Sequence, residues 1–486
     1  MENRELVIIG AGPAGLAAAA EAVRQGVSDI LLLERNPVPG GILCQCIHDG
    51  FGVERFGTSL TGPEYIGRFL PVLHAPGVTL LTGAMALRLE KGPAVTYADA
   101  TSLHTVRAGA VILATGCRER TRGAIRIPGT RPSGVYTAGV VQHLTNVDNV
   151  LVGKRAVILG SGDIGLIMAR RLTLEGMEIV CVLEKLPYCS GLARNVRQCL
   201  MDYDIPLHLR TTVVELIGDH RLEAVVAAEV DGRGTEKPGT RRTIPCDTLI
   251  LSVGLIPENE LARGCGIELD PDTGGAPQGG QVPVEAGAGV RYVLPHLLPQ
   301  GEGALLSLRV QAPGIMQTVR VMRGEERIAQ RSMRRLSPAE MIRLPLPAIT
   351  GTRPLTVELV QEERPQKLPE GELTCTVCPN GCVLTPVTGA DGQLAITGAL
   401  CKRGEAFGKS ELTDPQRTLT TTVRVRGGTR PLLSVRTASP VQKGALRALA
   451  RRLRDAEATA PVSAGQTVYE TAEARVIATA AVEKHA

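Results

Sequence analysis

The sequence contains no tryptophan, and aromatic residues make up only 2% of its 486 residues. Proteins that hold single-stranded nucleic acid stack the bases on aromatic side chains, so this scarcity argues against such a role. The net charge is only +5, and lysine and arginine are dispersed apart from a short stretch at residues 331–335. Because a basic stripe is also absent, we expect no nucleic-acid partner.

Long hydrophobic runs are lacking as well. No stretch of about 18 apolar residues is present, which predicts that no helix spans a membrane. The first residues lead directly into a strand-like run, without the basic segment and apolar core of a secretory signal, which predicts a cytoplasmic protein. In that compartment we expect the 12 cysteines to be thiols or metal ligands and not disulfides.

The remaining composition is that of a globular protein, with 43% hydrophobic and 21% charged residues. At about 100–200 residues per domain, the length predicts three or four domains.

A glycine-rich turn stands near the start of the chain. An apolar run at residues 6–9 leads into the turn, an alanine-rich helical stretch follows, and a second apolar run ends at Glu34. This order of strand, turn, helix, strand and acid is the βαβ dinucleotide fingerprint. The helix N-terminus offers free N–H groups to a pyrophosphate, and the acid can accept hydrogen bonds from ribose hydroxyls. The predicted cofactor-binding residues of this unit are Gly10, Gly12, Pro13, Ala14, Gly15, Glu34, Arg35, Gly41 and Ile42.

A second turn of the same kind follows a strand-like run at residues 155–159. The first glycine precedes the acid by 24 residues in both copies, from Gly10 to Glu34 and from Gly160 to Glu184. Two such units usually hold FAD first and a nicotinamide dinucleotide second. The carboxylate of Glu184 repels a 2′-phosphate, which favours NAD(H) over NADP(H). The residues predicted to bind it are Gly160, Ser161, Gly162, Asp163, Ile164, Gly165 and Glu184.

Two strand-to-turn segments complete the pattern, one ending at Ala114, Thr115 and Gly116 and the other at Gly254. They resemble the crossings between the FAD and nicotinamide domains of the two-dinucleotide-binding flavoproteins, of which thioredoxin reductase is a member. The resemblance implies an α/β fold with two Rossmann-like domains, and it adds these four residues to the predicted cofactor sites. Cys181, Cys189 and Cys199 are too widely spaced for the C-x-x-C pair of a thioredoxin reductase, which argues against disulfide reduction.

A narrower resemblance rests on residues 40–48, 60–65, 117–122 and 160–174 and covers roughly residues 1–275. These segments resemble bacterial FAD/NAD-dependent oxidoreductases found alongside anaerobic glycerol-3-phosphate dehydrogenase-like subunits. The resemblance implies that such a flavoprotein subunit is the electron partner. It also places the loop with Cys46 and His48 near the flavin, as a thiol and a proton donor, or with a role in shaping the loop only.

One element of these flavoproteins is missing from the sequence. A strand leading to a Gly-Asp turn, whose aspartate binds the flavin's ribityl chain and pyrophosphate, is expected after residue 277. The chain continues there without a Gly-Asp pair. The flavin site is therefore either weakened, completed by a partner, or decayed.

The C-terminal half contains two further sequence patterns. Residues 305–310, 317–322, 341–346 and 355–359 alternate between apolar and polar, which predicts a small antiparallel β-domain. Four cysteines follow in the spacing C-x2-C-x3-C-x18-C, and these predicted metal ligands are Cys375, Cys378, Cys382 and Cys401. Three clustered thiolates and a distant fourth suit a 4Fe–4S cluster, whereas structural zinc sites more often use two separated pairs. Zinc stays the alternative.

The cysteine segment resembles the N-terminal iron–sulfur module of molybdopterin oxidoreductases. It also resembles an uncharacterised small domain encoded beside the flavoproteins named above, which implies a natural fusion. Beyond it, residues 443–455 are expected to form a helix between short strands.

Together these patterns predict an NAD(P)H-linked flavin oxidoreductase that moves electrons between nicotinamide, FAD and an iron–sulfur centre. The alternative is a non-catalytic, NAD-binding, metal-stabilised assembly subunit with a decayed flavin site. The predicted domains are an FAD-type domain at 1–147 and 246–285, an NAD(P)-binding domain at 148–245, a small β-domain at 286–365 and a four-cysteine α+β domain at 366–486.

Overall fold

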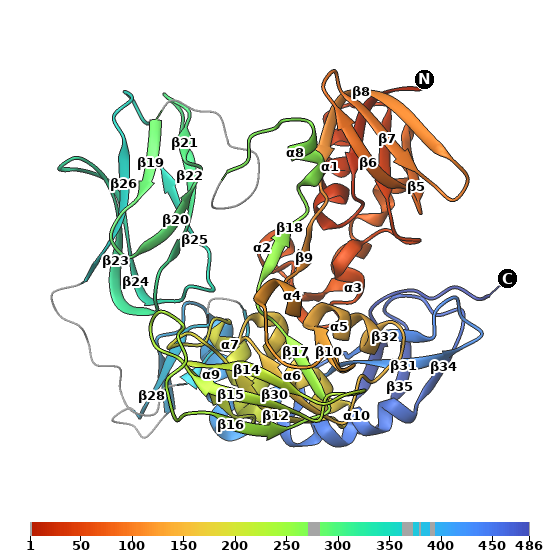
Figure 1. Ribbon diagram of the computed structural model, residues 1–486, viewed down its shortest axis with the longest axis vertical. Coiled ribbons are helices and arrows are strands. Elements are labelled where there is room, and N and C mark those ends of the chain that lie inside the picture. The colour runs from red at the N-terminus through yellow and green to blue at the C-terminus, as the bar shows by residue number, and fades with distance from the viewer. Residues whose placement is uncertain (1, 271–281, 362–372, 379–380, 389–393, 486) are drawn as a thin grey trace.

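The computed structural model describes residues 2–270, 282–361, 373–378, 381–388 and 394–485. It is a mixed α/β protein with two Rossmann-like units, a β-domain and a C-terminal part that lies against the second unit (Figure 1). Within these residues every helix falls short of the length and hydropathy that crossing a membrane requires.

The first unit is built on a six-stranded sheet in the order β5-β2-β1-β8-β7-β6. β1, β2, β5 and β8 pair in parallel, and a β-meander closes one edge. Helix α1 packs on one face, because its alanines allow a close approach to the strands. The elements are β1 (Glu2–Ile9), α1 (Pro13–Arg24), β2 (Ile30–Glu34), β5 (Val78–Thr82), β6 (Met85–Glu90), β7 (Ala94–Ala98) and β8 (Leu103–Leu113).

The loop between β2 and β5 carries short elements that face the second unit. They are η1 (Gly41–Cys44), β3 (Asp49–Phe51), α2 (Val53–Phe56), β4 (Leu60–Thr61), α3 (Gly62–Gly67) and η2 (Leu70–His74). A capping box at Thr61 and Glu64 fixes the start of α3.

The second unit has a parallel sheet in the order β10-β17-β11-β12-β13, with α5 and α6 against it. Its elements are β10 (Val135–Thr137), α5 (Ala138–Asn146), β11 (Arg155–Leu159), α6 (Asp163–Leu174), β12 (Glu178–Leu183), β13 (Leu207–His208) and β17 (Thr248–Leu251). A three-stranded antiparallel sheet of β14 (Thr211–Ile217), β15 (Ala224–Glu229) and β16 (Arg242–Pro245) packs on its other side.

This sheet corrects the predicted boundaries of the first two domains. β10 and β17 were expected in the FAD-type domain at 1–147 and 246–285, but both pair within the second sheet, where β17 lies between β10 and β11. The antiparallel pair β9 (Cys117–Glu119) and β18 (Leu255–Pro257) crosses between the units, and the short helix α8 (Glu260–Gly264) returns to the first unit beside β6. Residues 271–281 lie outside the described residues.

The β-domain that the alternating pattern predicts is present, and it contains two sheets around one core. Its strands pair antiparallel as predicted, except for the parallel pair of β19 and β26. It begins at β19, which pairs with β21 and β26, so its boundary precedes the predicted residue 286. Its strands are β19 (Val282–Ala286), β20 (Val290–Leu294), β21 (Leu297–Leu298), β22 (Ala304–Val310), β23 (Gly314–Arg323), β24 (Glu326–Leu336), β25 (Ile342–Leu346) and β26 (Leu355–Gln361).

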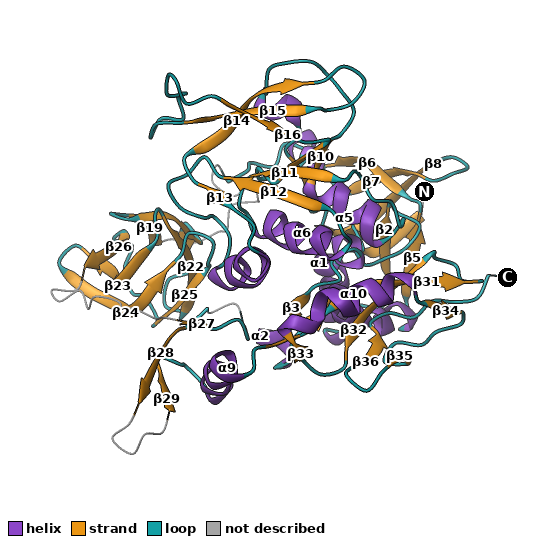
Figure 2. Cartoon of the chain, turned by 90° about the horizontal axis from the view of Figure 1, so that it is seen from below, coloured by secondary structure: helices purple, strands orange, loops and turns teal. Residues whose placement is uncertain are grey.

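The predicted domain at 366–486 consists of two parts. A small cysteine module, with β27 (Leu373–Thr374), β28 (Val383–Thr388), β29 (Leu394–Thr397) and helix α9 (Lys402–Thr413), has its own apolar cluster and stands at the side of the molecule (Figure 2). The predicted linker at 362–369 lies outside the described residues.

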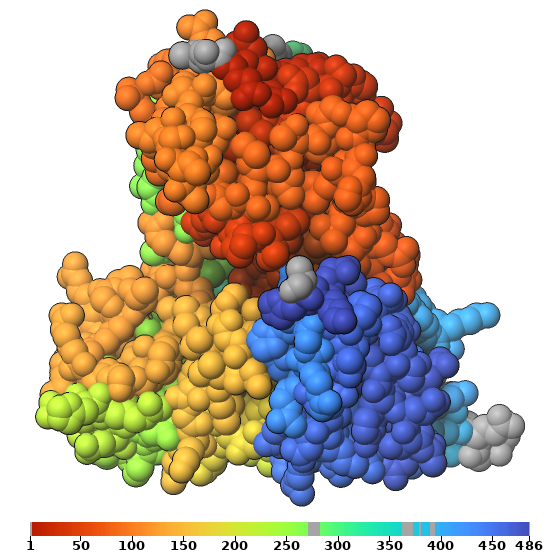
Figure 3. All heavy atoms as spheres, turned by 90° about the vertical axis from the view of Figure 1, so that its right-hand side faces the viewer, coloured from red at the N-terminus to blue at the C-terminus, as the bar shows by residue number. Residues whose placement is uncertain are grey.

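The last part shares a core with the second unit and is not a separate domain. A five-stranded sheet and α10 (Leu446–Asp455) pack with α6 in one apolar cluster, and Figure 3 shows the blue C-terminal part side by side with the yellow segment of the second unit. The expected helix at 443–455 is confirmed as η5 (Lys443–Ala445) followed by α10. The sheet strands are β31 (Thr420–Arg426), β32 (Leu432–Thr437), β34 (Glu457–Thr459), β35 (Thr467–Glu470) and β36 (Arg475–Ala478), beside the pair β30 (Gln416–Arg417) and β33 (Val441–Gln442).

Candidate functional site: two glycine turns and a cysteine module

The first glycine turn joins β1 to α1 with three glycines in three different roles. Gly10 has a φ of +103°, and a Cβ there would lie 2.4 Å from the Ala114 carbonyl oxygen. A Cβ on Gly15 would lie 1.8 Å from the Gly10 oxygen. Gly12 differs, because its nearest neighbour would be the Gly41 Cα at 3.8 Å. The fold therefore requires Gly10 and Gly15, whereas the missing side chain of Gly12 leaves room for a ligand.

The acid of the first unit is fixed by the turn that it follows. Glu34 ends β2 and is buried; its Oε2 accepts the Ala11 N–H at 3.0 Å and its Oε1 accepts the Asn36 N–H at 2.8 Å. A carboxylate has about four acceptor positions, so two remain for ribose hydroxyls. Gly41 lies against Gly12 and Pro13, and Ile42 beside it is exposed.

The predicted residues at the end of β8 border the same turn. The Ala114 N–H donates to the Ile9 carbonyl at 2.8 Å, and the Ala114 carbonyl faces Gly10. Thr115 and Arg35 turn toward the crossing segment instead, because the Thr115 hydroxyl donates to the Glu258 carbonyl and Arg35 forms an ion pair with the Glu258 carboxylate at 3.1 Å. The structure thus gathers most of the predicted flavin-side residues around one turn and directs these two to the link between the units.

The second turn repeats the first in detail. Gly160 has a φ of +98°, and its Cβ would lie 2.1 Å from the Ser252 carbonyl oxygen, which takes the place of Ala114. The Ser161 N–H donates to Glu184 Oε2 at 3.0 Å. Glu184 is more fully engaged than Glu34, since the hydroxyls of Ser161 and Ser190 also donate to Oε2 and the Leu186 N–H donates to Oε1. Gly254, at the end of the neighbouring β17, has a φ of +103°.

Asp163 begins α6 at the point where a pyrophosphate would approach the helix. Its Oδ1 accepts hydrogen bonds from the Leu192 N–H and from the Asn195 side-chain amide, both at 2.8 Å. A carboxylate at a helix N-terminus competes with a phosphate for the same N–H groups. These two donors hold it to one side.

The loop at residues 187–192 was not predicted as part of the site. It lies directly on the second turn, because the Ser190 N–H donates to the Ser161 hydroxyl at 2.8 Å and a Cβ on Gly191 would lie 2.8 Å from the Ser161 carbonyl. A repeat in the sequence could have indicated that this loop belongs to the site. Pro37 and Gly41 of the first copy recur as Pro187 and Gly191 at the same offset as the glycines and acids.

Cys46 and His48 lie in the packing between the units. Cys46 is buried with its Sγ 3.6 Å from the Gln142 side-chain oxygen of α5, and burial raises its pKa to about 12. His48 borders a cavity of about 20 Å³ with Arg170 and Thr420, and burial lowers its pKa to about 4. At neutral pH they are therefore a thiol and a neutral imidazole. Their role beside a flavin stays a prediction.

The cysteine module brings the four predicted ligands toward one another. The Cys375 N–H donates to the Cys382 carbonyl at 2.8 Å, which closes the turn that also holds Cys378. Cys401 is the N-cap of α9, where the N–H groups of Gly404 and Arg403 lower its pKa. Burial raises the pKa of Cys375 to about 11, and the other three sulfurs also act on it.

The donor set of four thiols on two short turns fits a metal centre in its chemistry. In the described part of the chain, however, no group of three or more histidine, cysteine, aspartate or glutamate side chains is arranged to hold a metal ion. All 12 cysteines are free thiols. Cys181, Cys189 and Cys199 are not paired, in agreement with their spacing.

The chain is similar to several known proteins. It is 27% identical over 398 residues to hydrogen cyanide synthase subunit HcnB of Pseudomonas aeruginosa, a match that covers 74% of this chain and 82% of the relative. It is 28% identical over 292 residues to an opine oxidase subunit of Agrobacterium tumefaciens, which covers 54% of this chain and about half of the relative, 55%. A solved thioredoxin reductase of T. acidophilum matches with a TM-score of 0.46 and 22% identity over 62% of this chain and 90% of that one.

Two family models match the chain. Residues 402–480 match a family of unknown function, DUF1667, which begins beside Cys401 and extends through the last sheet. Residues 4–277 match the pyridine nucleotide-disulphide oxidoreductases, and this match includes both glycine turns and both acids. The chain belongs to the pyridine nucleotide-disulphide oxidoreductase family of FAD- and NAD(P)-dependent enzymes.

Proposed function

We propose that this protein is an NAD(P)H-linked flavin oxidoreductase that passes electrons between a nicotinamide dinucleotide, FAD and an iron–sulfur centre. The observation that carries the proposal is the pair of glycine turns with matching backbone: Gly10 and Gly160 have φ values of +103° and +98°, and each turn donates one N–H to its acid over 3.0 Å. Two such turns in one chain suit two dinucleotides.

In this proposal the residues of the first turn, with Glu34 and Gly41, hold FAD, and those of the second, with Glu184, hold the nicotinamide dinucleotide. The carboxylate of Glu184 favours NAD(H) through its negative charge, which would repel a 2′-phosphate. Its acceptor positions, about four, are already taken by donors of the protein. When bound, the two cofactors supply hydride transfer and single-electron release. The chain itself binds the two pyrophosphates at helix N-termini and turns the Asp163 carboxylate away from one of them.

The four cysteines are proposed to hold a 4Fe–4S cluster, with zinc as the alternative. Cys375, Cys378 and Cys382 lie close together in the sequence, and Cys401 is the N-cap of α9. Thiolate-rich sites select Fe–S clusters and zinc, and a 3+1 spacing favours the cluster.

A partner subunit is also part of the proposal. The relatives named above are described as subunits of hydrogen cyanide synthase and of opine oxidase. The resemblance of residues 1–275 to flavoproteins found with glycerol-3-phosphate dehydrogenase-like subunits makes such a subunit the expected electron partner, in the cytoplasm. Co-purification with that subunit would support it, and full activity of the isolated chain with a physiological acceptor would argue against it.

A second candidate is the non-catalytic, NAD-binding assembly subunit. One observation favours it: after α8 the described chain continues at β19, which joins the β-domain and not the first unit. The sequence also lacks the Gly-Asp turn that closes the flavin site.

The two candidates differ in one assay. NADH-dependent reduction of an artificial acceptor such as ferricyanide, by the purified chain supplied with FAD, is required by the oxidoreductase and forbidden by the assembly subunit. Gly162→Ala provides the control, because its methyl group would occupy the space in which the dinucleotide approaches the second turn. The fold tolerates this methyl group, since its nearest contact would be 3.5 Å away, an ordinary van der Waals distance.

A further inference from the structure

A short helical segment after the loop at 187–192 contacts three parts of the protein. It consists of α7 (Ala193–Asn195), the π-helical turn η3 (Val196–Leu200) and η4 (Met201–Tyr203). The π-helical turn is unusual, because single π-turns are rare and are often found at functional sites. The segment packs along α6, the helix that starts at the second glycine turn.

Toward the nucleotide turn, the segment acts through Asn195. This side chain is buried and donates to Asp163 Oδ1 at 2.8 Å, while its own oxygen accepts from Gln198 at 3.3 Å. Asn195 therefore sets the direction of a carboxylate that would otherwise compete with the pyrophosphate.

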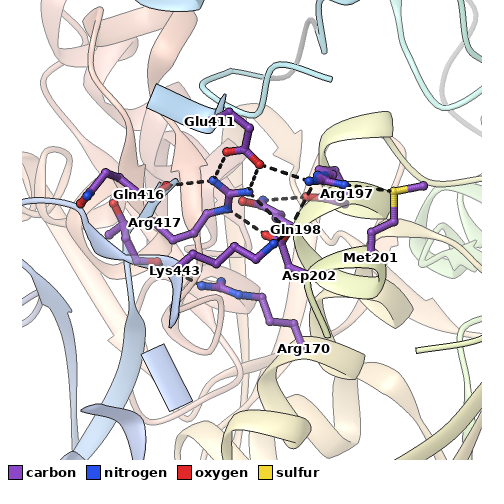
Figure 4. A network of polar contacts seen from close by, with 11 residues as sticks. Arg170, Arg197, Gln198, Met201, Asp202, Glu411, Gln416, Arg417 and Lys443 are labelled. Atoms are coloured by element: carbon purple, nitrogen blue, oxygen red, sulfur yellow. Dashed lines mark hydrogen bonds and ion pairs between the residues drawn. The ribbon is translucent and has the colours of Figure 1, made fainter. Parts of the chain in front are cut away.

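Toward the cysteine module, the segment acts through Arg197 and Asp202. Arg197 donates to Glu411 Oε1 at 3.3 Å, and Glu411 lies in the last turns of α9. Figure 4 shows Arg417 between the two carboxylates; its guanidinium donates to Asp202 Oδ2 at 2.8 Å and to both oxygens of Glu411 at 2.6 and 2.8 Å. Lys443 adds a third cation, 2.9 Å from Asp202.

Toward the first unit, the segment acts through Arg194. Its buried guanidinium donates to the Asp49 carbonyl at 3.4 Å and lies 3.7 Å from the Asp49 carboxylate. Asp49 follows His48 in the loop that faces the second unit. Positions 194, 195 and 197 therefore contact the first unit, the nucleotide turn and the cysteine module.

The ion cluster makes this connection stiff. The side chains of Asp202, Glu411 and Arg417 are only 3%, 4% and 5% exposed. A buried charge that loses its partner strongly destabilises the fold, so α9 cannot move away from Arg197 and Asp202 without a large penalty. Helix α9 extends about 18 Å at 1.5 Å per residue, with Glu411 near one end and Cys401 at the other. A displacement of the segment is therefore passed to the whole helix.

We propose that Asn195 and Arg197 are positioning residues of the nicotinamide turn, and that through them dinucleotide binding and the placement of α9 in the cysteine module are coupled. The inference rests on the proposed function, because it takes the second turn as the NAD(H) site. Coupling between two sites is reciprocal. A substitution that displaces α9 should therefore change the affinity for NADH, and NADH binding should change the stability of α9.

The test uses the full chain as isolated and needs no turnover. The dissociation constant of NADH is measured by calorimetry for the parent, Asn195→Ala and Arg197→Gln. Arg452→Gln is the matched control, since Arg452 on α10 forms an exposed ion pair with Glu473. Hydrogen exchange of residues 402–413 is followed with and without NADH.

The coupling predicts that Asn195→Ala and Arg197→Gln weaken NADH binding about 5-fold or more, whereas the control leaves it unchanged. NADH should slow exchange in residues 402–413 of the parent and of the control, and the effect should be lost in Arg197→Gln. Parent protein that binds NADH with no change in α9 exchange would overturn the coupling alone. Parent protein that binds no NADH would overturn the proposed nicotinamide site and the coupling with it.

Discussion

Gly12 and Gly162 occupy the same place in the two turns. Each is the N-cap of its helix with an extended backbone, at φ −75° and ψ −172° for Gly12 and φ −65° and ψ 160° for Gly162. A Cβ would come no closer than 3.8 Å to other atoms at Gly12 and 3.5 Å at Gly162. The fold accepts alanine at both positions, so the proposed function assigns these glycines to the close approach of a ligand to the backbone.

Alanine at these positions therefore separates the two cofactors. Gly12→Ala is expected to lose FAD and keep its NADH affinity, and Gly162→Ala to keep FAD and bind NADH at least tenfold more weakly, about 1.4 kcal/mol. Flavin absorbance and NADH calorimetry on each variant measure the two effects. When parent and variants are compared free of cofactors, both variants should unfold at the parental temperature, because bound cofactor itself stabilises the folded state.

The contrasting variant is Gly15→Ala. Its Cβ would lie 1.8 Å from the Gly10 carbonyl oxygen, so the helix must shift away from the strand. A lowered unfolding temperature is expected here. If Gly12→Ala were as unstable as Gly15→Ala, or if it kept stoichiometric FAD, the distinction between structural and ligand-facing glycines would be wrong.

The fourth cysteine provides a test of the metal site. Cys401 is exposed and lies at the start of α9, so Cys401→Ser leaves the apolar cluster around Cys375 intact. The variant is expected to fold and to lose most of its bound metal, because one of four thiolates is missing. Metal analysis measures this, with Cys189→Ser as the control. Unchanged metal content in Cys401→Ser would remove it from the ligand set.

Acid should weaken the buried ion cluster. Burial alone would raise the pKa of Asp202 and Glu411, but hydrogen bonds from Arg417 outweigh it and both pKa values are lowered. A carboxyl group with a lowered pKa stabilises the fold at neutral pH, and this contribution is lost as pH falls below about 4. Urea unfolding as a function of pH should show this loss in the parent and a smaller one in Asp202→Asn. Equal slopes would contradict the assignment.

The burial of His48 should cause a separate change in the free energy of unfolding, at higher pH than that of the ion cluster. Its pKa is about 4 in the folded protein because it is buried, whereas an unfolded histidine titrates near 6.5. The unfolded chain binds the extra proton between these values, so stability falls by up to about 1.4 kcal/mol per unit as pH drops below about 6.5. His48→Leu should flatten the slope between pH 6.5 and 4. A parental slope of the same size in that variant would mean that another group titrates there.

Local patterns in the sequence predicted the parts of the protein that depend on local geometry. The strand, turn and acid of both units are as expected because Gly10, Gly160, Glu34 and Glu184 act through neighbours in a single βαβ unit. Alternation predicted β22, β23, β25 and β26 in the β-domain. It missed β24, where four arginines and one glutamate obscure the apolar alternation.

Features that depend on distant pairings were not predictable. β10 has only three residues, and nothing within Val135–Thr137 indicates that it pairs with β17. The shared core of α6 and α10 depends on two apolar faces that meet across more than 250 residues. The cluster of Asp202, Glu411 and Arg417 is of the same kind, since each residue alone is an ordinary surface type.

We propose that one chain holds a flavin and an iron–sulfur centre together. The most direct test is the absorbance spectrum of the purified full chain, recorded before and after NADH is added. We expect flavin bands on a broad brown iron–sulfur absorbance, both bleached by NADH. A colourless protein that stays colourless after incubation with FAD would contradict it.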